Sequence, residues 1–198
     1  MSTIAIKKED KNKWERRTPL VPAHVKKLVE LGMNVVVEEQ PNRAFSNLEY
    51  INAGARVVQS VANYPIVLGV KEIPAEQIFP NKTYLFFSHT IKAQSYNMPL
   101  LREIIEQKCT LIDYECIRDR NNRRLVFFSR FAGIAGMIDS LSVYGNQLEL
   151  QGFQNPFTNI KQAFYYKDLK EAKNDIKGIA KDIKFETNSS VPPLIVGV

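Results

Sequence analysis

The sequence is poor in cysteine, with two among 198 residues. Cys109 and Cys116 lie too far apart for a CxxC motif, and no histidines accompany them at the spacing of a zinc site. We therefore expect no metal site. We interpret both cysteines as buried thiols of a protein kept in a reducing compartment.

Long apolar runs and glycine-rich loops are also absent. No run approaches the roughly 20 apolar residues of a membrane span, and residue 3 opens directly into a strand-like segment without an apolar signal core. We expect no membrane partner, and a cytoplasmic protein or an organellar one without its transit peptide. The sequence has neither GxGxxG nor GxxxxGK, so we expect no nucleotide cofactor to be bound by this chain alone.

An excess of charge of one sign is missing as well. Charged residues make up 24% of the chain with both signs interspersed, and the formal net charge is +6. The densest basic runs, residues 15–17 and 118–124, are short and contain acids, and no recognition motif accompanies them. We therefore expect no nucleic-acid partner. With 44% hydrophobic residues, the chain is long enough for one domain and part of a second.

Short apolar segments alternate with helical patterns along the first two thirds of the chain. This alternation predicts an α/β fold, a Rossmann-like parallel sheet flanked by helices. The continuous runs 66–70 and 84–87 are typical of parallel strands covered on both faces. Asn47 is the expected cap of a short helix that Gly54 ends. The expected strands are 3–7, 35–37, 57–58, 66–70, 84–87 and 111–112, and the longer expected helices are 23–31 and 95–108.

The last third of the chain predicts other structures. Residues 120–123 resemble the turn of a hairpin between strands 115–117 and 125–128, since Asn tolerates positive φ. Residues 131–150 predict one long helix, whose Gly133 and Gly136 need a reason such as close packing. Residues 167–184 predict a solvated amphipathic helix, and residues 194–198 the start of a buried strand.

Candidate chemical groups follow two of the predicted strands. Lys71 and Glu72 follow the strand 66–70, and His89 follows the strand 84–87. Because parallel strands end at one edge of a sheet, these groups should lie together. A lysine and a histidine side by side repel each other when both are charged, which favours proton transfer near neutral pH and suits an acid/base pair. The alternative for Lys71 is a solvated strand end, and for His89 a loop or capping role.

Further charged residues are expected near the same edge. Lys92 adds a cation one turn beyond His89 and suits a carboxylate ligand. Arg16 or Arg17 is placed to bind a carboxylate with both arms of its guanidinium group, although a surface salt bridge with Glu15 or Glu9 is the alternative.

Acidic and basic residues after the strand 111–112 complete this set. Asp113 or Glu115 is placed to hold a lysine or an incoming ammonium group. Arg123 and Arg124 are candidates for a second carboxylate, and an exposed turn is the alternative for at least one of them.

Several strings resemble one known superfamily. The strings 14–22, 68–72, 86–94, 111–115 and 131–138 look like the N-terminal domain of the alanine dehydrogenase, transhydrogenase and saccharopine dehydrogenase superfamily. Within it, residues 89–94 (HTIKAQ) and 15–17 (ERR) are most similar to the lysine-ketoglutarate reductase half of the bifunctional aminoadipic semialdehyde synthases.

The resemblance implies a reaction and roles for these residues. Lys71 and His89 would be the acid/base groups, Arg17 would hold a substrate carboxylate and Lys92 would be a second cationic contact. Glu72 and Glu115 would tune the lysine and the bound amine. The implied reaction joins L-lysine to 2-oxoglutarate and reduces the product to saccharopine with NADPH. The protein would be a homo-oligomer or part of a larger polypeptide, in the mitochondrial matrix if it is animal-like.

The resemblance also implies a domain organisation. Residues 1–130 would form the substrate-binding domain, 131–150 the crossover helix, and 151–198 the start of an NAD(P)-binding domain that stops before its glycine-rich loop. We expect this chain alone to be inactive. The alternatives are a non-catalytic binding or assembly subunit that kept the fold, and a member of the alanine dehydrogenase or transhydrogenase branch.

Overall fold

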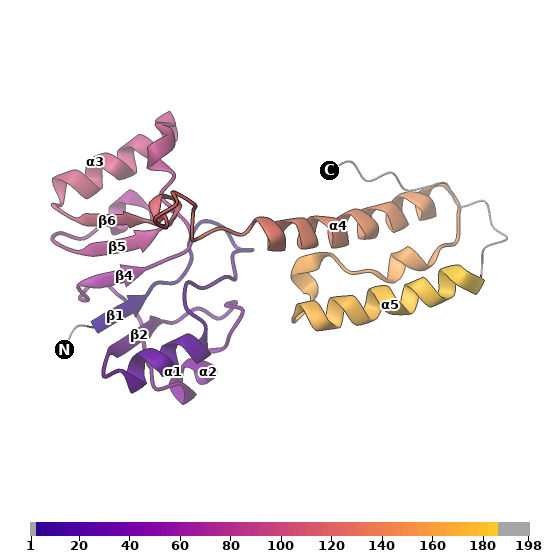
Figure 1. Ribbon diagram of the computed structural model, residues 1–198, viewed down its shortest axis with the longest axis horizontal. Helices are drawn as coiled ribbons and strands as arrows, with labels where there is room; N and C mark the ends of the chain where they lie inside the picture. The colour runs from indigo at the N-terminus through magenta and orange to yellow at the C-terminus, as the bar shows by residue number, and fades with distance from the viewer. Residues whose placement is uncertain (1–2, 186–198) are drawn as a thin grey trace. The chain divides into compact units, whose positions relative to one another are not determined.

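The computed structural model describes residues 3–185, with side chains up to residue 179. The described residues divide into two compact units, the first ending at Phe127 and the second beginning at Phe128 (Figure 1). The predicted strand 194–198 lies outside the described residues. No helix in the described part of the chain is long and apolar enough to cross a membrane.

The first unit is built on one parallel sheet of six strands in the order β3-β2-β1-β4-β5-β6 (Figure 1). Its strands are β1 (Thr3–Ile6), β2 (Asn34–Glu38), β3 (Arg56–Val58), β4 (Ile66–Leu68), β5 (Thr83–Phe86) and β6 (Thr110–Asp113). The prediction of a Rossmann-like α/β fold is confirmed. The chain starts in the middle of the sheet, builds outward to β3 and then returns to build outward on the other side of β1.

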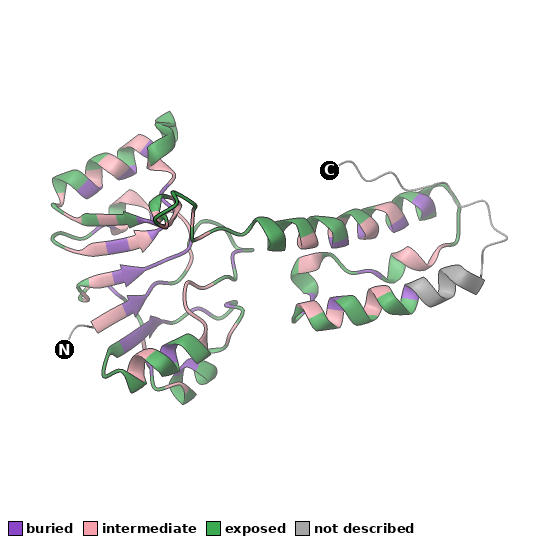
Figure 2. Cartoon of the chain, in the orientation of Figure 1, coloured by how far each residue is buried: buried purple, intermediate pink, exposed green. Residues whose placement is uncertain are grey.

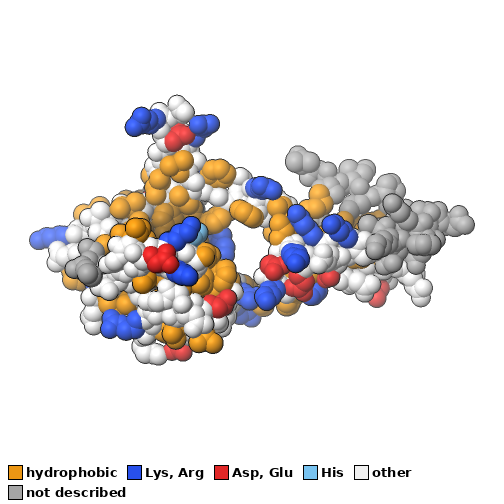
Figure 3. Space-filling view, turned by 60° about the horizontal axis from the view of Figure 1, so that its bottom comes forward, with side chains coloured by type: hydrophobic (Ala, Val, Ile, Leu, Met, Phe, Trp, Pro, Cys, Tyr) orange, Lys and Arg blue, Asp and Glu red, His pale blue; other side chains and the backbone are white. Residues whose placement is uncertain are grey.

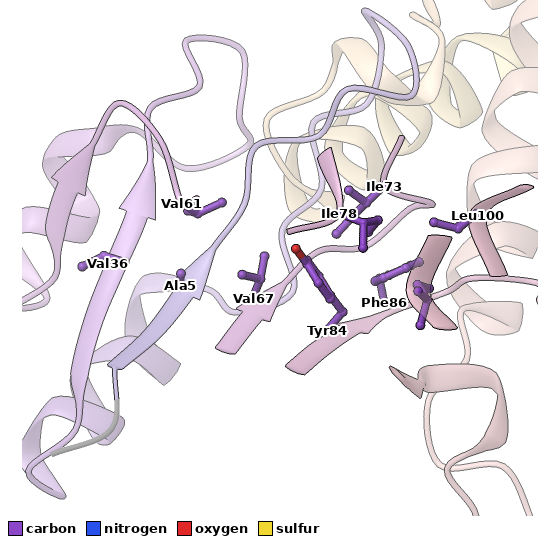
Figure 4. Packing of buried hydrophobic residues seen from close by; sticks show 10 residues of the cluster. Ala5, Val36, Val61, Val67, Ile73, Ile78, Tyr84, Phe86 and Leu100 are labelled. Atoms are coloured by element: carbon purple, nitrogen blue, oxygen red, sulfur yellow. The ribbon is translucent and has the colours of Figure 1, made fainter. Parts of the chain in front are cut away.

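Alternate residues of the central strands enter two separate cores. Ala5 and Val36 belong to a cluster with Val67, Tyr84 and Phe86 (Figure 4). The alternating strand residues Ile6, Val35 and Val37 belong to a second cluster on the opposite face, where they pack with Val25 of α1, Tyr50 of α2 and Ala55. Figure 2 shows the resulting burial of β1 and β2. Covering both faces in this way anchors the middle of the sheet.

Three helices cover these faces. The helices are α1 (Pro22–Glu30), α2 (Asn47–Asn52) and α3 (Met98–Glu106). Helix α1 begins with a proline in its first turn and ends before Gly32, whose φ of +82° is easily reached only by glycine. The cap of α2 is Ser46, not the predicted Asn47, because the Ser46 hydroxyl and the Glu49 carboxylate each accept the other residue's backbone N–H.

Two sequence-based predictions about burial are wrong. In β5, Tyr84 and Phe86 are buried while Thr83 and Leu85 are half-buried, so among the described residues the face of β5 that carries Leu85 is not fully covered, although Phe87 just after the strand is buried. Cys116 is exposed and Cys109 is only partly buried, so they are not buried thiols. An apolar run gives the composition of a strand but does not reveal which neighbours pack on it.

The predicted hairpin at residues 115–128 is reduced to a single antiparallel bridge between Arg118 and Arg124. Residues Tyr114–Cys116 form a 3₁₀ turn instead of a strand, because the Asp113 carboxylate accepts the N–H of Glu115 and turns the chain. The predicted positive φ is present at Asn122, at +62°.

The second unit contains two long helices, α4 (Ser129–Leu150) and α5 (Leu169–Phe185), joined by two short 3₁₀ segments, η5 (Pro156–Asn159) and η6 (Ala163–Tyr165). Its core contains Ile138, Ile160, Tyr166, Ala172 and Ile179. Within the described residues, the glycine that needs close packing is Gly145, which lies against the backbone of η5, whereas Gly133 and Gly136 face open space.

Candidate functional site

The site is formed by the loops that follow β1, β4, β5 and β6, which we call the carboxyl edge: residues 7–17, 69–72, 87–92 and 113–115. These strands are in parallel register, with Ile6 beside Leu68 and Phe86 beside Asp113. Backbone hydrogen bonds continue the pairing beyond the strands, from Gly69 N–H to the Leu85 carbonyl at 2.9 Å and from Phe87 N–H to the Val70 carbonyl at 3.1 Å. Groups on neighbouring loops are therefore held side by side.

His89 lies between two carboxylates at this edge. Its Nδ1 atom is 3.2 Å from Glu115 Oε2, and its Nε2 atom is 3.9 Å from Glu72 Oε1. Its ring stacks on Phe87 with the centroids 6.2 Å apart and the planes 20° apart. Among the described residues, the imidazole contacts these two carboxylates, and no hydrogen bond joins it to the predicted lysine partner Lys71.

Glu115 connects several cations. Its Oε1 atom is 3.6 Å from Lys92 Nζ and 3.2 Å from Arg124 Nη1, while its other oxygen contacts His89. Burial raises the pKa of the Glu115 carboxyl, but the hydrogen bond from His89 and the charges of Lys92 and Arg124 outweigh this effect, so the pKa is lowered. Glu115 therefore holds its negative charge between three basic groups.

The structure separates the two adjacent arginines. The Arg123 side chain is 75% exposed and pairs with Asp119 in the turn, with Nε 3.0 Å from Oδ2. Arg124 turns toward Glu115 and also donates to the Val126 carbonyl at 3.3 Å. Its Nε atom is buried and has no hydrogen-bond partner. The structure thus brings Arg124 to the carboxyl edge and leaves Arg123 outside it.

Glu72 pairs with a residue that the sequence did not indicate. Lys11 Nζ donates to Glu72 Oε2 at 2.9 Å, across 61 residues of sequence. Burial raises the pKa of the Glu72 carboxyl, while the hydrogen bond and charge of Lys11 and the charge of His89 lower it by more. Glu72 is therefore a charged carboxylate beside His89.

Glu9 fixes the backbone beneath Lys71. Its two carboxylate oxygens accept the N–H groups of Val70 at 2.7 Å and Lys71 at 2.9 Å. Burial raises the pKa of the Glu9 carboxyl, against the effect of these two hydrogen bonds. Glu9 thereby ties the loop after β1 to the end of β4, and no feature of its sequence position could have distinguished it from Glu15.

Arg17 and Glu15 form a two-armed pair. Arg17 Nε donates to Glu15 Oε1 at 2.8 Å, and Arg17 Nη2 donates to Glu15 Oε2 at 2.6 Å. Burial raises the pKa of the Glu15 carboxyl, but the hydrogen bonds from Arg17 and the charges of Arg17 and Lys71 lower it overall. Arg17 thus forms the salt bridge with Glu15 that was the alternative to a carboxylate-binding role. The charge of Glu15 also interacts with the charge of Lys71.

The Lys71 ammonium group differs from its neighbours. Within the described part of the chain, no hydrogen bond or ion pair reaches Lys71 Nζ, although Lys11, Lys92 and Arg124 each pair with a carboxylate of this edge. The side chain is half-buried. The carboxyl edge therefore contains a cation that is available to a ligand.

Comparison with known proteins gives the family of the chain. Residues 5–135 match the family described as alanine dehydrogenase/PNT, N-terminal domain. The chain belongs to this family. It is 39% identical over 196 residues to the mitochondrial alpha-aminoadipic semialdehyde synthase of Bos taurus, covering 99% of this chain and 21% of that protein. The chain thus spans about a fifth of the length of that relative.

Two further relatives extend the comparison of this alanine dehydrogenase/PNT N-terminal domain. The lysine-forming, NAD(+) saccharopine dehydrogenase of Candida glabrata is 38% identical over 128 residues, covering 62% of this chain and 34% of that protein. A solved L-alanine dehydrogenase structure is 29% identical with a TM-score of 0.62, covering 75% of this chain and 42% of that one.

The loop between β1 and α1 does not fit the phosphates of a nicotinamide nucleotide. The connection from β1 to α1, residues 7–21, contains no glycine, and it carries the Glu9 and Glu15 carboxylates where a phosphate would need N–H donors. The described residues also contain no group of three or more His, Cys, Asp and Glu side chains arranged to hold a metal ion. The charged groups of the carboxyl edge are a histidine, carboxylates, lysines and an arginine that pairs with Glu15.

The exposed charges of the first unit are otherwise mixed. On the face shown in Figure 3, acidic side chains lie next to basic ones in small groups, with apolar side chains between the groups. This arrangement is that of an ordinary solvated surface.

Proposed function

We propose that the chain is the substrate-binding and acid/base part of a lysine-ketoglutarate reductase, which joins L-lysine to 2-oxoglutarate and reduces the product to saccharopine in lysine degradation. The similarity to a semialdehyde synthase along nearly the whole chain supports this assignment. The observation that carries it is the available Lys71 ammonium group at an edge where the neighbouring charges are paired.

The reaction needs proton transfers that these residues can provide. The ε-amine of lysine must lose a proton before it attacks the keto carbon of 2-oxoglutarate, and the resulting hydroxyl must gain one to leave as water. We assign these two transfers to Lys71 and His89, because both are at the ends of adjacent parallel strands. The imine formed is then reduced by a hydride, for which we propose NADPH as the donor.

The substrates carry carboxylates, and cations of the edge are suited to bind them. We propose Arg17 and Lys92 for this role, as the resemblance implies. In place of Arg123 we propose Arg124, because it lies at this edge beside Glu115 and the planar guanidinium group suits a carboxylate. Glu72 and Glu115 would hold the substrate amine and keep the histidine in place.

The compartment follows from the relatives alone. The bovine relative is named as mitochondrial, so we propose the mitochondrial matrix if the present protein is animal-like.

Binding to this chain tests the proposal directly. By calorimetry we expect saccharopine and 2-oxoglutarate to bind. Loss of a charge-assisted hydrogen bond costs about 1.5–3 kcal/mol, so Arg17→Ala should weaken saccharopine binding by roughly 10- to 100-fold. Arg102→Ala on the exposed side of α3 is the matched control and should leave binding unchanged. Absence of saccharopine binding to a folded chain at millimolar ligand would contradict the proposal.

Lys71→Met tests the acid/base role in the full-length polypeptide. We expect turnover to fall by at least ~100-fold, the contribution typical of a general acid or base. Lys26→Met, on the exposed side of α1, should leave turnover unchanged. Unchanged turnover in Lys71→Met would refute the assignment of Lys71.

A second candidate function is that of an alanine dehydrogenase, favoured by the match to the solved L-alanine dehydrogenase. This alternative predicts that pyruvate and L-alanine bind more tightly than 2-oxoglutarate and saccharopine in the same calorimetric assay. A third candidate, a non-catalytic binding subunit, predicts saccharopine binding without turnover in the full-length polypeptide.

A further inference from the structure

His89 has a backbone conformation that needs support. Its φ is +55° and its ψ is 12°, in the left-handed region that favours glycine. A non-glycine residue held there costs of order 1–3 kcal/mol, and it persists only when its surroundings over-determine it. The residues on either side of His89 must therefore be fixed by strong contacts.

A buried serine and aspartate provide these contacts. Ser88 is 0% exposed and Asp113 is 8% exposed. Asp113 Oδ2 accepts the Ser88 N–H at 3.2 Å and also a short hydrogen bond from the Ser88 hydroxyl. The Ser88 hydroxyl oxygen in turn accepts the N–H of Thr90 at 3.2 Å. The residues before and after His89 are thus both tied to one carboxylate on the neighbouring strand β6.

The same carboxylate also positions the partner of the imidazole. Asp113 Oδ1 accepts the N–H of Glu115 at 2.7 Å, and Glu115 Oε2 lies 3.2 Å from His89 Nδ1. The two oxygens of Asp113 therefore fix the backbone of His89 on one side and that of its carboxylate partner on the other. The His89 side chain keeps one orientation because the Ser88 and Asp113 side chains that support it are themselves buried and hydrogen-bonded.

We infer that the buried Ser88–Asp113 pair is a positioning device that sets the orientation and the tautomer of His89. A carboxylate can only accept a hydrogen bond, so the contact with Glu115 places the proton on Nδ1. Lys92 Nζ, 3.5 Å from the same nitrogen, is then a neighbouring charge without a hydrogen bond to the ring. Glu72 Oε1 is 3.9 Å from Nε2, beyond hydrogen-bond distance, so Glu115 and not Glu72 decides the tautomer. Neutral His89 consequently presents the lone pair of Nε2, the nitrogen suited to accept a proton from a substrate.

This inference rests on the proposed function only in taking His89 as an acid/base group. Its test needs no substrate. The sequence contains two histidines, so nitrogen NMR of the chain with labelled histidine gives two resolvable rings. His24, exposed on α1, is the internal control and should show the Nε2–H tautomer that a neutral imidazole favours in water. We expect His89 of the unaltered chain, at a pH where it is neutral, to show the Nδ1–H tautomer.

Two substitutions separate positioning from general stability. In Asp113→Asn, and to a smaller extent in Ser88→Ala, we expect the nitrogen shifts of His89 to move toward those of His24, while the His24 signals stay in place. Asp168→Asn is the matched control, since asparagine caps the start of α5 as well as aspartate does. Asp168→Asn should change the nitrogen shifts of neither His24 nor His89.

The inference is overturned if His89 of the unaltered chain shows the Nε2–H tautomer, or if the nitrogen shifts of His89 do not move toward those of His24 in folded Asp113→Asn or Ser88→Ala. Should Asp113→Asn fail to fold, the unaltered chain and Ser88→Ala still decide. A confirmed tautomer without saccharopine binding would refute the proposed function and leave the positioning role intact.

Discussion

Two glycines of α4 should respond in opposite directions to the same substitution. A Cβ atom on Gly145 would lie 2.5 Å from the Phe157 carbonyl carbon and 2.7 Å from Thr158 N, both of them backbone atoms. A Cβ atom on Gly136 would meet nothing within 4 Å. Gly145 is therefore required for the approach of η5, and Gly136 is not required by any described neighbour.

The magnitudes follow from two effects. Replacing glycine by alanine in an exposed helix interior stabilises the helix by about 1 kcal/mol. This gain is the whole effect that we expect for Gly136→Ala. Overpacking costs about 1–3 kcal/mol, and at Gly145 the upper end applies because backbone cannot rotate out of the way. Gly145→Ala gains the same helix propensity and should therefore lose about 2 kcal/mol overall. The two variants should differ by about 3 kcal/mol, more than 100-fold in the equilibrium for opening.

Native-state hydrogen exchange measured on peptides is the suitable assay. Peptides from α4 and α5 should exchange faster in Gly145→Ala and more slowly in Gly136→Ala, whereas peptides from β1 and β2 in the first unit provide the unaffected reference. Equal protection of α4 in the two variants would refute the assignment of close packing to Gly145.

Two further predictions concern the first unit. Ser46→Ala removes the cap that accepts the Glu49 N–H, so we expect urea unfolding to show a loss of about 1 kcal/mol, with Ser46→Asp as the control that keeps a capping oxygen. Arg17→Met removes the partner that lowers the pKa of the Glu15 carboxyl. Because a lowered pKa stabilises the fold above the unfolded pKa of roughly 4.3, the variant should be less stable at neutral pH, and the difference should shrink as the pH falls below that value. A difference that grows in acid would contradict this account.

Local sequence patterns were sufficient for the fold of the first unit. Apolar runs and glycines such as Gly32 predicted the alternation of strands and helices, because burial and backbone freedom act over a few residues. The parallel sheet then followed, and with it the expectation that Lys71 and His89 lie at one edge. The half-burial of β5 and the exposure of Cys116 did not follow, because they depend on which segments pack nearby.

The sequence by itself determined which strand ends carry the charged groups of the site. Only the tertiary structure decided their partners: Lys11 reaches Glu72 across 61 residues, and of two adjacent arginines Arg124 turns to Glu115 while Arg123 pairs with Asp119. The pattern of apolar residues along a strand fixes where the strand ends and which residues follow it. The direction of a long side chain instead depends on the turn that carries it and on charges brought near by other strands.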